Sequence, residues 1–436
     1  MEYAIGLIVY ILFTLGVIKF KKEIPPYSLL FLFMVYCFFA YGVASVYFQV
    51  FPEASFLNNS AYGIDYLNDV YPYYPRAFTV FLLGYISFIL GYIAVGQKKL
   101  DLIPFKTSIR FNYWVTVLAF LIANWFSFYF RFHYRAAVPT VMSATHKFAN
   151  YWWYSFHYLA MILLVMVVFL AIKSCKAHKI WVSIFCGLNF TLSLLLLGWK
   201  AGVIWTVLIF FQLVFLVRLS ENGLQMTIRN KGRLIIICLI VLGTVLLVFR
   251  VAPVYRSEIK TWKKIENTIS PRLKDAYRDK IINRVKKQLF KPLSFSEFET
   301  MSIQIMNRLT GINSLVPVIA HKPTSQERRV TVLSNVFKPG SYHPEIYYGQ
   351  YIIQDRSVTE NSGVTTHAPS GISVFYIYGQ YFGVIAGFII IGLLAHLAEN
   401  TLIEFSKISS DFISILALLF AVIFPAVVFE GTVFFF

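Results

Sequence analysis

The sequence predicts an all-α protein: a polytopic bundle of about ten transmembrane helices with a large, partly helical loop outside the cytoplasm. Only 14% of the 436 residues are charged and 58% are hydrophobic, whereas soluble domains carry about 25% charged residues. Apolar stretches of about 17 to 24 residues also recur along the chain, and a stretch of this length crosses hydrocarbon as a helix. A bilayer accommodates that many apolar stretches, and a single buried core does not.

The predicted spans alternate in direction, because the connections between them alternate in charge. We place the spans at residues 4–20, 27–50, 77–96, 112–130, 155–172, 180–197, 202–217, 234–251, 371–395 and 411–429. Basic connections lie around residues 19–22, 98–110, 173–179 and 218–233. The segment 51–76 instead carries three acidic residues and one arginine. Short basic connections stay in the cytoplasm, so both termini and the long loop are expected outside it.

Three regions follow from this topology. Residues 1–251 form a bundle of about eight spans, residues 252–370 form the large basic loop, and residues 371–436 form the C-terminal transmembrane helices. The N-terminus lacks the basic region and cleavage site of a removable signal peptide, so the first span is expected to be retained. The four cysteines lie in apolar runs or short connections and predict no disulfide framework.

The long loop is expected to be folded, although it carries 18 Lys/Arg against 10 Asp/Glu. Ser270-Pro271 is typical of a helix start, and apolar residues follow at every fourth position, with basic residues off that stripe. Such a basic amphipathic helix can rest on an anionic lipid surface. A second helix is predicted at Ser294, because Ser294 and Glu297 match a capping box. Gly311 is expected to end that helix in the left-handed conformation.

Cations near the outer face, followed by a polar re-entry into the membrane, form the candidate functional site. The cations are Lys200, Arg250, Arg256, Arg308 and Arg329. The re-entry covers residues 365–383 and contains His367 and Tyr376. Arginine forks bind phosphate oxygens bidentately. A histidine that titrates near neutrality is the obvious general base for an acceptor hydroxyl.

Each of these residues also has a structural explanation. Lys200 and Arg250 would anchor helix ends at the membrane interface. Arg308 falls in the last turn of the second loop helix, where the helix dipole favours any cation. Arg256 and Arg329 would be solvated surface charges, and His367 would be a hydrogen-bonded loop residue. The sequence leaves these alternatives open.

Several kinds of chemistry have no support in the sequence. It contains no Walker loop, no His/Cys/Asp cluster with metal-ligand spacing, no Gly-x-Ser-x-Gly elbow in the outer loops and no Arg-rich voltage-sensor helix. No cofactor, metal ion or nucleic-acid partner is therefore expected.

The architecture and several short motifs resemble the Wzy-type polymerases of bacterial O-antigens and capsules, and more distantly the O-antigen ligases. Residues 198–202 (Gly-Trp-Lys-Ala-Gly) resemble the family's small-residue, basic, small-residue turn. Arg329 and Gly340 match its Arg-x10-Gly loop pattern, of which a second copy is missing. Residues 367–370 (His-Ala-Pro-Ser) and 378–383 (Tyr-Gly-x-x-x-Gly) resemble the re-entry after the main periplasmic loop.

The resemblance implies a GT-C-like, metal- and nucleotide-independent glycosyltransferase in a bacterial inner membrane. Such a polymerase joins undecaprenyl-diphosphate-linked oligosaccharide repeat units into O-antigen, capsule or exopolysaccharide at the outer face of that membrane. The implied partners are the lipid-linked oligosaccharides, membrane lipids and a chain-length regulator protein. His367 would be the base, and the arginines would hold the diphosphate.

Three alternatives remain at this point. An O-antigen-type ligase would transfer the glycan to another acceptor with nearly the same residues. A non-enzymatic flippase or transporter of lipid-linked oligosaccharide predicts inverted repeats and charges inside the bundle, and the sequence shows no internal repeat and few charges within the spans. A structural or sensory membrane protein is the third alternative.

Overall fold

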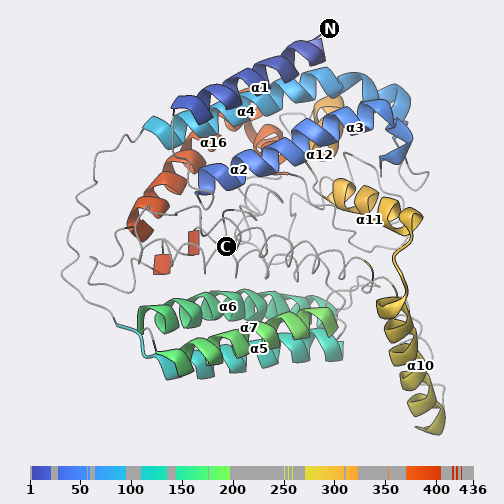
Figure 1. Ribbon diagram of the computed structural model, residues 1–436, viewed down its shortest axis with the longest axis vertical. Helices are drawn as coiled ribbons and strands as arrows, with labels where there is room; N and C mark the ends of the chain where they lie inside the picture. The colour runs from blue at the N-terminus through green and yellow to red at the C-terminus, as the bar shows by residue number, and fades with distance from the viewer. Residues whose placement is uncertain are drawn as a thin grey trace.

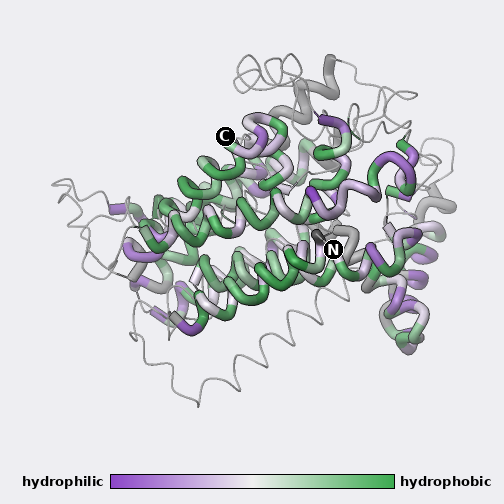
Figure 2. The backbone as a smooth tube through the Cα atoms, turned by 90° about the horizontal axis from the view of Figure 1, so that it is seen from above, coloured by the Kyte–Doolittle hydropathy of each residue, from purple (hydrophilic) through white to green (hydrophobic). Residues whose placement is uncertain are grey.

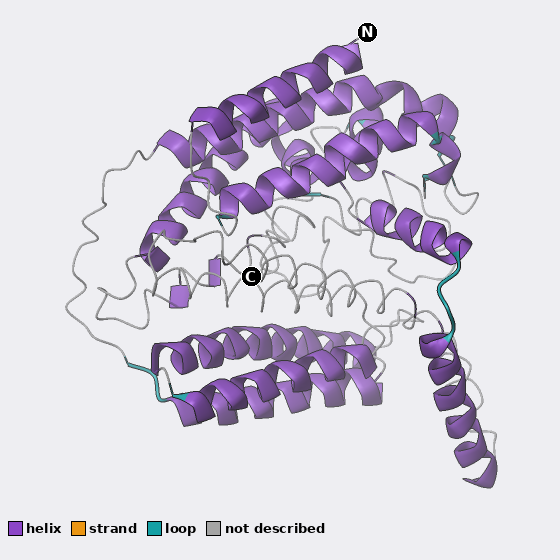
Figure 3. Ribbon diagram, viewed as in Figure 1, coloured by secondary structure: helices purple, strands orange, loops and turns teal. Residues whose placement is uncertain are grey.

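The described part of the chain is entirely helical in its regular structure. The computed structural model describes residues 2–20, 28–55, 57–58, 64–94, 110–134, 144–174, 176–196, 250, 254, 258, 271–308, 311–322, 352, 370–403, 415–416, 419–420 and 424. Within these ranges every regular element is a helix (Figure 3). The predicted all-α class is therefore confirmed.

The helices form two groups and an outer pair (Figure 1). The first group contains α1 (Glu2–Phe20), α2 (Leu29–Cys37), α3 (Ala44–Val50), α4 (Tyr74–Ala94), α12 (Gly311–His321) and α16 (Gly371–Ile403). The second group contains α5 (Tyr113–Tyr134), α6 (Ala144–Ser174) and α7 (Ala177–Leu196). The outer pair is α10 (Pro271–Phe290) and α11 (Phe295–Arg308). Shorter helical turns cover Phe38–Val43, Pro52–Ala54, Tyr66–Val70 and Tyr71–Tyr73.

Within the described residues, four helical stretches are long and apolar enough to cross a membrane. They are Leu29–Val50, Tyr66–Ala94, Tyr113–Phe130 and Gly371–Thr401. Each overlaps a predicted span, and the chain is a membrane protein. The apolar parts of α1 and α6, Tyr3–Lys19 and Ser155–Ala171, are shorter. The predicted span 202–217 and most of 234–251 and 411–429 lie outside the described residues.

The ends of the long helices gather at two opposite edges of the molecule (Figure 1). The start of α1, the end of α3 and the start of α4 share one edge with α10 and α11, and we name this edge the outer end. The charges of the connections predict that it faces away from the cytoplasm. Hydrophobic residues follow the helices along their length, whereas hydrophilic residues gather toward their ends (Figure 2).

Helices α4 and α16 meet backbone to backbone. A Cβ on Gly91 would lie 2.1 Å from the carbonyl oxygen of Ile389, and a Cβ on Gly392 would lie 2.2 Å from that of Phe88. Small residues let helices approach this closely inside a membrane, where packing replaces the hydrophobic effect as the force between them. The glycines therefore fix the α4–α16 crossing.

Helix α16 is a helical hairpin and not one straight helix. Gln380 has a φ of 50° and a ψ of −138°, a conformation that costs a residue with a side chain about 1–3 kcal/mol. The rings of Phe375 and Phe388 are 5.6 Å apart, although a straight helix would separate the two residues by about 20 Å. The segment 371–379 therefore folds back against 381–403.

Helix α12 lies inside the first group, although the sequence assigned its residues to the outer loop. All residues from Gly311 to Ile319 are buried. The helix packs against the π-helical turn Phe38–Val43, where a Cβ on Gly311 would lie 2.3 Å from the carbonyl oxygen of Ala40. The prediction that Gly311 ends the preceding helix is wrong. Helix α11 ends at Arg308, and Gly311 begins α12 because no side chain fits against Ala40.

The predicted starts of the two outer helices are confirmed. Helix α10 begins at Pro271 and α11 at Phe295. The Glu297 N–H donates to Ser294 Oγ at 3.3 Å, and the Ser294 N–H donates to the Glu297 carboxylate at 3.5 Å. This reciprocal pair is the capping box that the spacing of the two residues predicts.

Substituting Gly91 with alanine should destabilise the protein by at least about 2 kcal/mol, because the new methyl group meets rigid backbone and forces the helices apart. Gly16→Ala is the matched control, since nothing lies within 4 Å of a Cβ at Gly16. Thermal unfolding in detergent, followed by size-exclusion chromatography, measures both variants. Equal melting temperatures for the two variants would contradict the backbone contact.

Candidate functional site

A network of buried hydroxyl groups joins three elements of the first group. Tyr41 donates to Ser370 Oγ at 2.8 Å. Ser370 and Ser373 share a hydrogen bond of 2.8 Å, and Ser373 shares one of 3.0 Å with Ser314. The Ser370 N–H also donates to Ser314 Oγ at 3.0 Å. Polar groups in an apolar interior are costly unless paired, so this hydroxyl network ties α12 and the start of α16 to the π-helical turn.

A second set of polar contacts continues this network along α12. Asn313 follows Gly311 by two residues and accepts a hydrogen bond of 2.7 Å from the Tyr74 hydroxyl. Tyr74 in turn shares a hydrogen bond of 3.0 Å with Tyr66. Tyr66 begins the helical turn Tyr66–Val70 that precedes α4, and Tyr74 is the first residue of α4. These contacts fix α12 at the outer half of the first group.

An arginine and two tyrosines form a rim beside the network. The Arg76 Nε–H donates to the Tyr381 hydroxyl at 3.0 Å. The Tyr381 ring lies 5.6 Å from the ring of Tyr376, edge to face. Arg76 is exposed, and the Gln380 reversal holds Tyr376 and Tyr381 against each other. The exposed guanidinium offers charge-assisted donors for a phosphate group, and the half-buried Tyr381 ring offers an aromatic surface for a sugar.

Among the predicted residues, Tyr376 is the one that the structure places at this rim. Its side chain is buried beside Tyr381. Arg308 ends α11, in the last turn as predicted. Four further predicted residues lie outside the described part of the chain: Lys200, Arg256, Arg329 and His367.

Arg250 lies away from the rim and binds the link between α10 and α11. It donates to the carbonyl oxygens of Lys291 and Pro292 and lies 3.4 Å from the Glu297 carboxylate. Lys291 pairs with the same carboxylate at 2.6 Å. The hydrogen bond from Lys291 lowers the pKa of Glu297, with smaller contributions from the Ser294 N–H and the Arg250 charge. These pairs therefore persist at neutral pH and are lost only as the pH falls through that lowered pKa.

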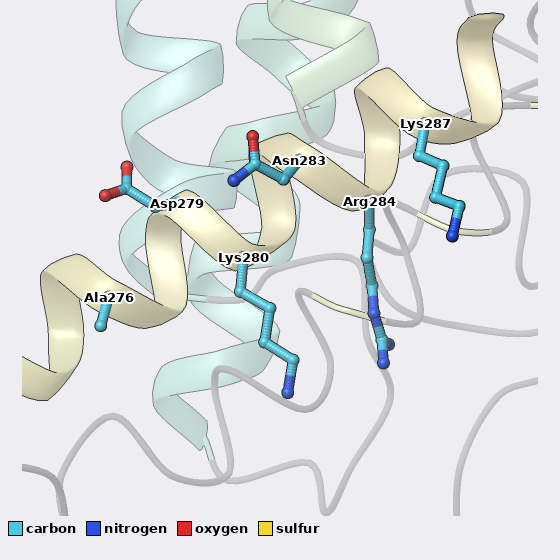
Figure 4. Close-up of a pocket in the computed structure, with 6 residues that line it drawn as sticks. All are labelled: Ala276, Asp279, Lys280, Asn283, Arg284 and Lys287. Atoms are coloured by element: carbon cyan, nitrogen blue, oxygen red, sulfur yellow. The ribbon is translucent and has the colours of Figure 1, made fainter.

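A groove of about 440 Å³ follows α10, and the described residues that line it all belong to that helix. Three cations point from α10 to the same side, namely Lys280, Arg284 and Lys287 (Figure 4). Arg284 forms an ion pair with Glu258, whose carboxylate also accepts a hydrogen bond from Tyr277 at 3.4 Å. The basic face predicted for this helix is thus present. Glu258 holds α10 in place through its contacts with Arg284 and Tyr277.

A buried carboxylate at the opposite end of the bundle has a structural explanation. Glu399 accepts a hydrogen bond of 2.6 Å from the Leu29 N–H and another from the Tyr92 hydroxyl. Leu29 begins α2, and an anion is stabilised at a helix N-terminus. Glu399 therefore joins α2, α4 and α16 at the end away from the rim.

Sequence reasoning missed Arg76 and the hydroxyl network. Arg76 was counted only as a charge in a connection, because its contact with Tyr381 joins residues 305 positions apart in the chain. Tyr41 and Ser314 carry no local signal, because their role depends on the position of α12 inside the bundle. The described residues contain no group of three or more His, Cys, Asp or Glu placed to bind a metal ion.

Comparison with protein-family models, with curated proteins and with solved structures finds no match to this chain.

The hydroxyl network should behave as one unit. Tyr41→Phe should cost about 0.5–1.5 kcal/mol, and Ser370→Ala should cost more because it leaves Tyr41 and Ser373 without their shared partner. The double variant should be little worse than Ser370→Ala alone, which thermal unfolding of the three variants measures. Strict additivity of the two single effects would contradict the contact.

Proposed function

We propose that the protein is a glycosyltransferase that joins undecaprenyl-diphosphate-linked repeat units at the outer face of a bacterial inner membrane. The observation that carries the proposal is the exposed cation Arg76, hydrogen-bonded to Tyr381 on the same helical hairpin that contributes Ser373 to the buried hydroxyl network. The network holds Ser370, and His367 precedes Ser370 by three residues. The proposal takes this histidine as the base.

The proposed reaction uses two lipid-linked substrates. The hydroxyl oxygen of the acceptor glycan attacks the anomeric carbon of the donor glycan, and the bond from that carbon to the diphosphate breaks. His367 takes the acceptor's proton, and undecaprenyl diphosphate leaves with the electron pair of the broken bond. Arg76 stabilises the charge that builds on the leaving diphosphate, because donors fixed in advance cost no reorganisation.

The proposed architecture keeps the topology that the charges predict. About ten spans in a GT-C-like arrangement would surround the site, and residues 252–370 would supply the outer loop. Helices α10 and α11 support this arrangement, since α10 lies crosswise to α5–α7 at the outer end (Figure 1). Arg256, Arg308 and Arg329 remain proposed contacts to the second diphosphate. Arg250 acts as a positioning residue in this scheme, because its partners are the chain's own carbonyl groups and Glu297.

The test is the chain length of surface glycan in a host whose own copy is deleted. Deletion should leave single repeat units, and wild type should restore the ladder of longer chains. His367→Ala should abolish the ladder. Arg76→Ala should reduce it about tenfold or more, the effect of losing about 1.5–3 kcal/mol from a charged hydrogen bond. Immunoblots of the membrane fraction confirm equal amounts of each variant.

Arg110→Ala is the matched control, since Arg110 is an exposed arginine just before α5 at the opposite end. It should restore the ladder fully. An intact ladder in the deletion strain contradicts polymerisation. Long chains that stay on the carrier lipid would indicate a ligase, and loss of all repeat units from the outer face would indicate a flippase.

A further inference from the structure

The link between α10 and α11 exposes an unusual run of apolar side chains. Phe290 is 79% exposed and Phe295 is 82% exposed, and Leu293 between them is 46% exposed. We name residues 290–295 the elbow. Phe298, one turn into α11, is also exposed. Large aromatic side chains in water are costly, so this surface has a partner.

The elbow is held rigidly from its inner side. Arg250 donates to its carbonyl groups at Lys291 and Pro292, and the capping box closes its end at Ser294 and Glu297. The polar groups of the elbow are thereby paired toward the bundle. Its apolar side chains are left exposed. A fixed elbow presents Phe290 and Phe295 without the entropy cost of ordering a free loop.

The charges around the elbow identify the partner. Lys286 and Lys287 are exposed near the end of α10, and Lys291 lies within the elbow. Lys291 and Arg250 share the single carboxylate of Glu297, so the cations exceed the anions there. Aromatic side chains flanked by lysines match an anionic bilayer surface, where the rings enter the acyl region and the ammonium groups meet lipid phosphates.

The position of the elbow at the outer end agrees with this partner. Helices α10 and α11 lie at the same edge of the molecule as the ends of α1, α3 and α4 (Figure 1). The outer surface of a bilayer crossed by α4 would lie at the level of these helix ends. The elbow therefore reaches lipid headgroups of the same membrane.

We propose that the elbow is a membrane anchor, which inserts Phe290 and Phe295 into the outer leaflet and binds anionic lipid phosphates through Lys286 and Lys287. The anchor fixes α10 and its cationic groove parallel to the bilayer surface. It operates whichever reaction the protein carries out.

Spin labels measure the insertion directly. The full chain, with its four cysteines replaced by serine, receives a single cysteine by Phe290→Cys, Phe295→Cys or Ser296→Cys. Ser296 is the matched control, because it is exposed next to Phe295 but lies on another side of α11. The nitroxide collides with oxygen, which dissolves in lipid, and with a nickel chelate, which stays in water. The ratio of the two collision rates, the oxygen-to-chelate ratio, reports whether the label lies in lipid. The vesicles are phosphatidylcholine with or without phosphatidylglycerol.

In anionic vesicles the oxygen-to-chelate ratio should rise severalfold from position 296 to positions 290 and 295. Lys286→Gln together with Lys287→Gln should lower the ratio at position 295 toward its value in pure phosphatidylcholine. A chelate-dominated signal at positions 290 and 295 would show that the elbow stays in water and would overturn the anchor. Loss of both collision signals would reveal a protein partner in place of lipid, and equal insertion in neutral vesicles would overturn the role of the lysines.

Discussion

The backbone contact between α4 and α16 determines where the outer-end residues lie. Gly91 and Gly392 lie against carbonyl groups of the opposing helix. These contacts fix the position of each helix along the axis of the other. The Gln380 reversal then sets the short segment 371–379 beside α4, where a Cβ on Gly84 would lie 3.4 Å from Ile372. Ser370 enters the hydroxyl network as a consequence. The network and the rim both depend on this one crossing.

The same constraint explains why strain is tolerated at Gln380. A reversal at a residue with a side chain is unfavourable by itself, and the packing of Phe375 against Phe388 and the glycines of α16 stabilises it. Strained backbone clusters at binding sites, where the surrounding packing holds side chains in one arrangement. Tyr376 and Tyr381, on either side of the reversal, form the rim in this way.

The local features of the fold were predictable from the sequence, and the tertiary ones were not. Span length and the capping residues Pro271, Ser294 and Glu297 act through neighbours in the chain, so the pattern reports them. The burial of α12 and the reversal at Gln380 depend on contacts with distant residues, and neither leaves a local pattern. For the same reason Tyr376 was found as part of a polar re-entry, whereas Arg76 and Tyr41 were missed.

The most direct test of this account is the distance between the two arms of α16. In a cysteine-free chain, Phe375→Cys with Phe388→Cys should be joined efficiently by a short bifunctional thiol reagent in native membranes. A straight helix would hold these positions about 20 Å apart and would give no intramolecular crosslink. Efficient crosslinking supports the hairpin and the site built on it. Absence of the crosslink, with Phe375→Cys and Phe388→Cys each reactive alone, would contradict both.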